Sequence, residues 1–315
     1  MRMKEFTETL ATKMEARLNG VKVTPTTNWK NNGILREGLT ICKVGEPVAP
    51  ILYIDHLFHR FGSGELSIED ILEQVISDYE NLSTPIIPDL HTLLSAVDFI
   101  DKIRIRLVNL DENKKMIEER HLLHYELENT GLVCLFYAKV FTEDTSTGEI
   151  GLSESVLKQH LPEIDNAETL YQVTIEKTKS EDVYFESMKK VIVEMLNRNH
   201  IDDSILDMIE NTDNFMYVLS NTAKNYGAFT ILTEVARQMI LKQFPNGKVT
   251  IFPSSVHELI LIRTDFDENI ESLQQMVREI NHTELSKEDF LSDNVYHFDA
   301  HTGKLTIAGS EVDSL

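Results

Sequence analysis

The sequence predicts an α+β fold in which mixed, mostly antiparallel sheets pack against helices. Short apolar segments that alternate with polar residues predict strands, and stripes repeating every three or four residues predict helices. Turn-forming residues separate the two kinds of segment. The chain has 315 residues, of which 42% are hydrophobic. That is enough to bury one large core or two modest ones.

The N-terminal region begins with a predicted helix over residues 4–19. Its apolar residues recur every four positions, and Gly20 stands where a helix ends. A hairpin follows, with its turn at Asn31, Asn32 and Gly33, residues that tolerate positive φ. Pro25 predicts that the first strand of this hairpin lies at the edge of its sheet.

The next segments predict helices at 51–61 and from Ser67, where Ser67 and Asp70 resemble a capping box. Residues 103–108 alternate apolar residues with Arg104 and Arg106, as a half-buried strand does. Residues 125–141 predict one long strand, or a bent pair interrupted near Gly131.

The middle of the chain is acidic and predicts helices at 153–160, 183–197 and 201–209. We therefore expect an N-terminal α+β domain over 1–141 and an acidic helical segment over 142–210. A C-terminal α+β domain should cover 211–307, followed by a frayed tail at 308–315.

The C-terminal region predicts a ββαββα unit followed by a terminal hairpin. Strands are expected at 215–220, 227–232, 248–252 and 258–263, with one helix after the second strand and another at 269–281. The terminal hairpin should pair 295–298 with 304–307 across a turn that contains Gly303.

The charge of the chain is strongly negative. Formal net charge is −22, from 52 acidic against 30 basic side chains. Such a surface repels phosphate, so we expect no direct nucleic-acid binding and no attraction to anionic lipid. It favours solubility, and it can also attract a basic protein partner.

The compartment predicted for this chain is the cytoplasm. The first residues lack the apolar stretch of a secretory signal, and no segment has the ~20 apolar residues that span a bilayer. Two cysteines, Cys42 and Cys134, are too few for a disulfide scaffold. Both lie among strand-forming residues and are expected to be reduced thiols in the core.

Several motifs, in a fixed order, resemble a known family. They are NNG at 31–33, LTI at 39–41, APILYI at 49–54, YVLSN at 217–221, YGA at 226–228, IL at 231–232, FPSSVHELI at 252–260 and LSDNVYHF at 291–298. The chain resembles a family of acidic proteins from Gram-positive anaerobic bacteria, a domain of unknown function with the serial number 5688. The resemblance implies an association with mobile elements, and it implies no mechanism.

A group of polar residues near the C-terminal strands is the best candidate for a binding site. Its members are Asn221, Tyr226, Ser254, Ser255, His257 and Glu258. A serine, a histidine and an acid are the ingredients of nucleophilic catalysis. Their close spacing, and the lack of a Gly-x-Ser-x-Gly elbow, favour instead a turn that His257 and Glu258 stabilise by hydrogen bonds.

The sequence predicts no metal site and no cofactor. His56 and His59, like His121 and His124, are three residues apart and could share a helix face. Neither pair comes with an obvious third ligand, and the extended zincin pattern is missing. We expect these imidazoles to lie at or near the surface.

These observations favour a non-enzymatic interaction or regulatory protein that binds a basic protein partner. A hydrolase or metal-dependent enzyme that uses residues 254–258 is the first alternative. The second is an acidic mimic of nucleic acid, which requires carboxylates aligned on one surface. The sequence leaves the oligomeric state open.

Overall fold

The computed structural model describes residues 1–45, 49–81, 99–143, 146–198, 215–263 and 270–310. The chain divides into two compact units, each made of two separate segments. Unit 1 contains residues 1–102 and 138–150, and unit 2 contains residues 103–137 and 151–315. The α+β fold class predicted from the sequence is confirmed, because helices accompany three mostly antiparallel sheets.

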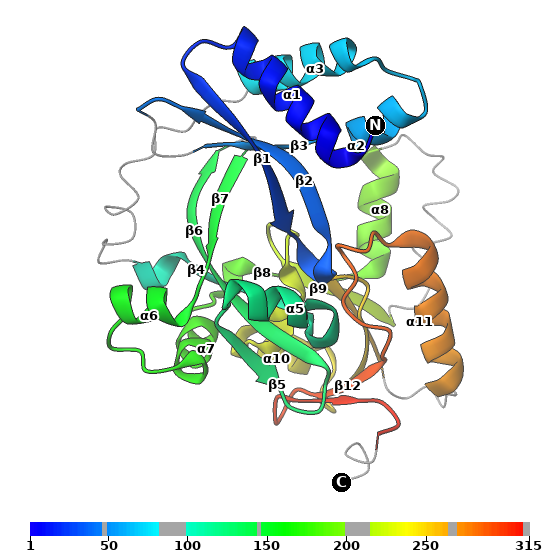
Figure 1. Cartoon of the computed structure of the whole chain (residues 1–315). Helices are drawn as coiled ribbons and strands as arrows, with labels where there is room; N and C mark the ends of the chain where they lie inside the picture. Colours follow the sequence, from blue (N-terminus) through cyan, green and yellow to red (C-terminus); the bar gives the residue numbers. More distant parts are fainter. Residues whose placement is uncertain (46–48, 82–98, 144–145, 199–214, 264–269, 311–315) are drawn as a thin grey trace. The chain divides into compact units, whose positions relative to one another are not determined.

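Unit 1 is built on a three-stranded antiparallel sheet in the order β1-β2-β3. The helices α1, α2 and α3 lie together over this sheet (Figure 1). The elements are α1 (Met3–Arg17), β1 (Val21–Trp29), η1 (Asn31–Gly33), β2 (Leu35–Lys43), β3 (Ile51–Tyr53), α2 (Asp55–Gly62), α3 (Ile68–Asn81) and η2 (Phe99–Lys102).

Helices α1 and α3 of unit 1 form where the periodic pattern predicts them. Phe6, Leu10 and Met14 on α1 are fully buried and pack in one cluster with apolar residues of the sheet and of α3. Helix α3 begins with the predicted capping box, in which the Asp70 amide donates to Ser67 Oγ and the Ser67 amide donates to Asp70 Oδ2. Side-chain capping of this kind satisfies amides that have no partner inside the helix.

Strand β1 is an edge of its sheet, as Pro25 predicts. Val23 lies opposite Ile41, whose own amide donates to the carbonyl oxygen of Pro50. The amide of Val23 therefore points away from β2, and it donates to Oε1 of Glu15 on α1 at 2.7 Å. Pro25 lies two residues further along the same side and has no N–H group.

A second sheet contains β4 (Ile103–Asn109), β6 (Leu132–Glu143) and β5 (His124–Leu127), with β7 (Ser146–Gly151) paired to β6. Strand β6 passes from unit 2 into unit 1 at residues 137 and 138. The helices of this part of unit 2 are α5 (Leu110–Arg120), α6 (Glu154–His160) and α7 (Ala167–Glu176). Each is capped by a side chain, from Asn109, Ser153 and Asn166 respectively.

The largest sheet has six strands in the order β13-β12-β10-β11-β9-β8, and its described pairs are antiparallel. Its strands are β8 (Val183–Ser187), β9 (Met216–Asn221), β10 (Lys248–Phe252), β11 (Glu258–Arg263), β12 (Tyr296–Asp299) and β13 (Lys304–Ile307). The connecting elements are η3 (Ser180–Asp182), α8 (Met188–Arg198), η4 (Gly227–Leu232), α10 (Glu234–Gln243) and α11 (Ile270–Glu284).

Helices α10 and α11 cover opposite faces of this sheet. The ring of Tyr217 packs edge-on against Phe244 at the end of α10, and α11 packs against Phe252 in β10. Tyr217 pairs with Leu261 and Phe252 pairs with Ile260. Because neighbouring residues of a strand face opposite sides, the two helices must lie on different faces.

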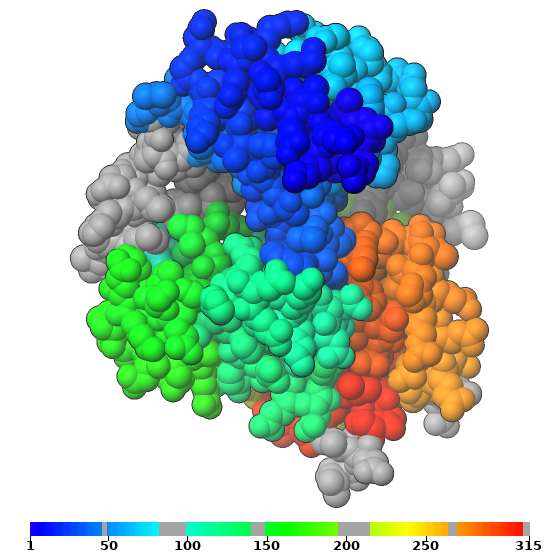
Figure 2. Space-filling view, viewed as in Figure 1, coloured from blue at the N-terminus to red at the C-terminus, as the bar shows by residue number. Residues whose placement is uncertain are grey.

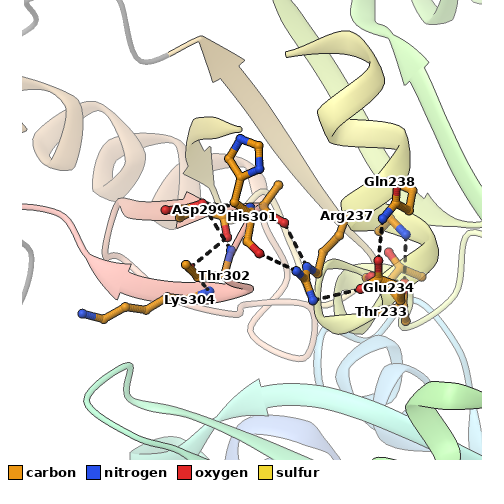
Figure 3. A network of polar contacts seen from close by, with 11 residues as sticks. Thr233, Glu234, Arg237, Gln238, Asp299, His301, Thr302 and Lys304 are labelled. Carbon is orange, nitrogen blue, oxygen red and sulfur yellow. Dashed lines mark hydrogen bonds and ion pairs between the residues drawn. The ribbon is translucent and has the colours of Figure 1, made fainter. Parts of the chain in front are cut away.

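The terminal hairpin β12-β13 is confirmed, and Arg237 of α10 holds its turn (Figure 3). Arg237 Nε donates to the carbonyl oxygen of Ala300 at 3.0 Å, and Nη2 donates to that of His301 at 2.7 Å. Asp299 Oδ1 accepts the amides of His301 and Thr302 from inside the turn. The helix and the hairpin are thus joined by charge-assisted hydrogen bonds.

Several predicted elements differ from the structure. Residues 227–232, expected as a strand of the ββαββα unit, form the 3-10 helix η4. The helix expected over 183–197 begins with strand β8, and the helix expected over 51–61 is preceded by β3. Cys42 is exposed and not in the core, because it alternates with buried Ile41 in β2. The helix predicted at 201–209 and residues 311–315 of the predicted tail lie outside the described residues.

Among the helices of the described ranges, none has both the length and the apolar character to cross a membrane.

Candidate functional site

The candidate residues lie where two neighbouring strands of the six-stranded sheet meet the loops that join them to other elements. Strand β9 ends at Asn221 and β11 begins at Glu258, and Ser220 and Glu258 are paired across the two strands. We define the His257 corner as Asn221, Tyr226, Ser254, Ser255, His257 and Glu258, together with Asp289. Asp289 is added by the structure.

Both ring nitrogens of His257 have hydrogen-bond partners. The backbone amide of Tyr226 donates to Nδ1 at 3.0 Å, and Nε2 lies 3.0 Å from Oδ1 of Asp289. Because Nδ1 accepts a hydrogen bond, the hydrogen of the neutral ring must be on Nε2, which donates to Asp289. The tautomer and the orientation of the ring are therefore fixed.

Asp289 is itself held in place. Its Oδ2 accepts the hydroxyl of Ser286 at 2.7 Å, and its amide donates to the carbonyl oxygen of Ser286 at 3.0 Å. The backbone of the same loop also joins the corner, because the amide of Val256 donates to the carbonyl oxygen of Asp289. Residues 286–289 thus form a support for the imidazole from 32 positions away in the sequence.

The serines of the corner form its turn. Ser255 is buried, its Oγ accepts the backbone amide of His257 at 3.1 Å, and its own amide donates to the carbonyl oxygen of Glu258. Ser254 is half-buried beside it. The hydroxyl of Ser255 therefore contacts the backbone of His257, while the ring of His257 is turned to Tyr226 and Asp289.

Asn221 closes the connection that leads from β9 to Tyr226. Its Oδ1 accepts the amide of Asn225 at 3.1 Å, and its Nδ2 donates to the carbonyl oxygen of the same residue at 2.7 Å. Tyr226 has a φ of 50° and lies in the left-handed region. L-residues seldom adopt this conformation, because Cβ crowds the following carbonyl oxygen.

Gly227 allows the two loops to approach closely. Its amide donates to the carbonyl oxygen of His257, and Ser220 Oγ donates to that same oxygen at 2.6 Å. A Cβ atom at position 227 would lie 2.2 Å from Ser220 Oγ and 2.4 Å from the amide nitrogen of Asn221. Only glycine fits here without movement of the backbone.

A stack of side chains extends the corner toward β4. The guanidinium carbon of Arg106 lies 3.8 Å from the ring centroid of Tyr226 and 4.2 Å from that of Tyr137. The rings of Tyr226 and His257 have centroids 5.2 Å apart. A planar guanidinium stacked on aromatic rings is a favourable cation–π arrangement.

Glu258 belongs to a group of carboxylates around Tyr184 on strand β8. Burial raises the pKa of the Tyr184 phenol, and the carboxylates of Glu194, Glu186 and Glu258 raise it further. Lys224 lies over the ring of Tyr184 at 4.4 Å from its centroid. Lys190, which pairs with Glu186, lowers the pKa of Tyr184 in turn, so this group of carboxylates has two lysines close by.

This geometry suits support of a loop better than activation of a nucleophile. A histidine that acts as general base turns one ring nitrogen toward the hydroxyl while its other nitrogen is oriented by an acid. In His257, Asp289 orients Nε2. The other nitrogen, Nδ1, accepts a hydrogen bond from the backbone amide of Tyr226 and so does not face a hydroxyl. The turn expected at residues 254–258, with His257 fixed by hydrogen bonds, agrees with these contacts.

The two histidine pairs differ in their placement. His56 and His59 are exposed and three residues apart in α2. His121 follows the last residue of α5 with a φ of 49°, whereas His124 begins β5, so these two imidazoles do not share the helix face that their spacing would have allowed. Over the described ranges, no three histidine, cysteine, aspartate or glutamate side chains are grouped as metal ligands.

Two functional candidates escaped the sequence analysis. Asp289 is preceded by Ser286, and this Ser-x-x-Asp spacing is a local signal for a hydrogen-bonded turn. Arg106 is visible in the alternation of β4, but the aromatic rings that enclose it come from β6 and from the start of η4. Nothing in the local sequence indicates that pairing.

A protein-family model matches residues 3–300, nearly the whole chain. The chain belongs to a family of unknown function (DUF5688). No curated protein and no solved structure matches the sequence of this DUF5688 member. The match covers all the residues of the His257 corner.

Proposed function

We propose that this protein is a non-enzymatic binding protein that presents an acidic surface to a basic protein partner. The observation that carries the proposal is an exposed stretch of unit 2 formed by α6, α7 and η3. Between residues 154 and 182 this stretch carries seven exposed carboxylates and three lysines. Negative surface potential attracts and orients a positively charged partner.

The carboxylates of this stretch, which we name the α6–α7 acidic surface, belong to one part of the fold. They are Glu154, Glu163, Asp165, Glu168, Glu176, Glu181 and Asp182. The segment that carries them, coloured green, occupies a continuous part of the face seen in Figure 2. Glu154 pairs with Lys158 within α6, which leaves the charge of the surface strongly negative.

The hydrogen bonds of His257 favour binding over catalysis. The ring of His257 is engaged on both sides, which argues against the hydrolase alternative at residues 254–258. The family resemblance supports a bacterial origin and a connection with mobile elements as part of this proposal, and the sequence of the first residues supports a cytoplasmic setting. A regulatory or accessory factor is the role that these features favour.

A titration with a short lysine-rich peptide tests the proposal. Fluorescence anisotropy should detect binding at low ionic strength and weaker binding at about 0.15 M salt, because exposed charges are screened. The variant Glu163→Gln/Asp165→Asn/Glu176→Gln removes three exposed carboxylates from the α6–α7 acidic surface. We expect this variant to bind the peptide with an affinity about tenfold lower, because each of the three lost ion pairs contributes about 0.2–1 kcal/mol to binding.

A matched control is available on α5 of the same unit. The variant Asp111→Asn/Glu118→Gln/Glu119→Gln also removes three exposed carboxylates and so gives the same net charge. It should bind the peptide nearly as well as the unaltered protein. Equal weakening in both variants would show a response to net charge alone and would contradict the proposed surface.

A further inference from the structure

The connection from β9 to η4, residues 222–226, has a shape that must be held by its surroundings. Lys224 and Tyr226 both have a φ of 50°. Non-glycine residues remain in this region only where neighbouring contacts over-determine the backbone. The contacts made by Tyr226 therefore decide the shape of the connection.

His257 accepts hydrogen bonds from two successive backbone amides, that of Tyr226 at the end of the connection and that of Gly227 after it. The amide of Gly227 donates to its carbonyl oxygen at 3.0 Å, and the amide of Tyr226 donates to its ring nitrogen Nδ1 at 3.0 Å. A carbonyl oxygen accepts a hydrogen bond at every pH. An imidazole nitrogen accepts one only while the ring is neutral, since both nitrogens of the cation are donors.

The opposite side of the ring is held by Asp289. Asp289 Oδ1 accepts the Nε2 hydrogen, and this contact would become an ion pair when the ring gains a second proton. The ring would then stay in place with its new Nδ1 hydrogen facing the amide hydrogen of Tyr226. Two donors cannot form a hydrogen bond, so the amide of Tyr226 must move away.

Other charged groups around the ring come from several elements. Arg106 of β4 stacks on the ring of Tyr226, and Asp289 contacts Nε2 of the imidazole. Further charged groups lie within two residues of His257, Tyr226 or Asp289 in the sequence. They are Glu258 on β11, Lys224 in the connection, and Lys287 and Glu288 beside Asp289.

We propose that His257 is a pH-responsive latch on the connection 222–226. The neutral imidazole holds Tyr226 in the left-handed conformation, and the cation releases the amide of Tyr226 while Asp289 keeps the ring in place. Histidine side chains change charge between about pH 5 and pH 8. The release changes the packing of the Tyr226 ring against Arg106, and the carbonyl of His257 still holds Gly227.

Nuclear magnetic resonance of the full chain labelled with ¹⁵N-tyrosine tests this latch. The amide signal of Tyr226 is identified by its loss in Tyr226→Phe, and spectra are recorded from about pH 8 to about pH 5. We expect the Tyr226 signal to shift in one titration step. The signal of Tyr79, identified in the same way by Tyr79→Phe, should stay constant, because Tyr79 lies in unit 1 on α3, which contains no histidine. The circular dichroism of the chain should not change.

The variant His257→Asn separates this latch from other effects of pH. The asparagine side chain keeps an oxygen that accepts the amide of Tyr226 and does not titrate, so the Tyr226 signal should no longer depend on pH. His282→Asn is the matched control, because His282 is an exposed histidine whose Nε2 lies 3.6 Å from Asp293 Oδ2. In this control the titration of Tyr226 should remain.

A second variant keeps the test decisive if His257→Asn does not fold. Asp289→Asn removes the carboxylate that stabilises the cation, so the midpoint of the Tyr226 titration should move to lower pH. An unchanged midpoint would contradict the latch. So would a constant Tyr226 signal while the ring of His257 titrates, or a titration that persists in His257→Asn.

Discussion

Single residues determine the shape of the His257 corner. Gly227 brings two loops within hydrogen-bonding distance, and His257 joins them through both its ring and its carbonyl oxygen. The sequence identifies six of the seven members of the corner by their chemical type, and four of these, Asn221, Tyr226, Ser255 and His257, make the hydrogen bonds described above. It cannot indicate Asp289, because only folding brings a residue 32 positions away against the imidazole.

Replacing Gly227 by alanine should destabilise unit 2. The new methyl group would meet Ser220 Oγ, the amide of Asn221 and the carbonyl oxygen of His257, all within 2.7 Å. Crowding of this kind costs about 1–3 kcal/mol, measured as a lower free energy of unfolding in urea. The control Gly62→Ala, at the end of α2, adds a methyl group that meets no atom within 4 Å, and it should not lower the free energy of unfolding.

At the scale of elements, prediction succeeds where local pattern and tertiary packing agree. Helices α1 and α3 follow their apolar stripes, and Pro25 correctly places β1 at an edge. It fails at 227–232, whose apolar residues favour a strand. There the left-handed Tyr226 and the close approach of Gly227 turn the chain into a 3-10 helix.

The contact between α10 and the terminal hairpin depends on the shape of one side chain. Arg237→Lys keeps the charge but loses the fork that donates to the carbonyl oxygens of Ala300 and His301 (Figure 3). We expect a loss of about 1–2 kcal/mol in the free energy of unfolding, because hydrogen bonds from charged groups are stronger than neutral ones.

The control for this substitution is Arg278→Lys, at an exposed position of α11. It should leave the unfolding midpoint within the experimental error. If Arg237→Lys is equally neutral, the carbonyl contacts of Arg237 do not hold the hairpin.

At the scale of the whole molecule, the chain is negative at neutral pH and carries several tyrosines with perturbed titration. Burial is the largest cause that raises the pKa of Tyr171, Tyr296, Tyr125, Tyr184 and Tyr217. The neutral phenol is therefore favoured in the folded state. Above about pH 10 the unfolded chain releases these protons first and binds fewer of them, so stability must fall as pH rises.

Tyr171 offers a direct test of this alkaline loss. Tyr171→Phe removes the ionisable group but keeps a ring that can stack on Tyr125, 4.4 Å away between centroids. Urea unfolding measured from about pH 9 to about pH 11 should show a shallower loss of stability in the variant than in the unaltered protein. Identical slopes would mean that Tyr171 ionises equally in both states.

Strand β1 also has a consequence for how copies of this protein behave at high concentration. An open strand edge is a template on which another molecule can add its own strand, and chains of such additions lead to fibrils. On β1 the outward amide of Val23 donates to Glu15, and the next residue on that edge, Pro25, has no N–H group. A carboxylate and an imino acid two residues apart therefore remove two of the outward donors on which another strand could pair at β1.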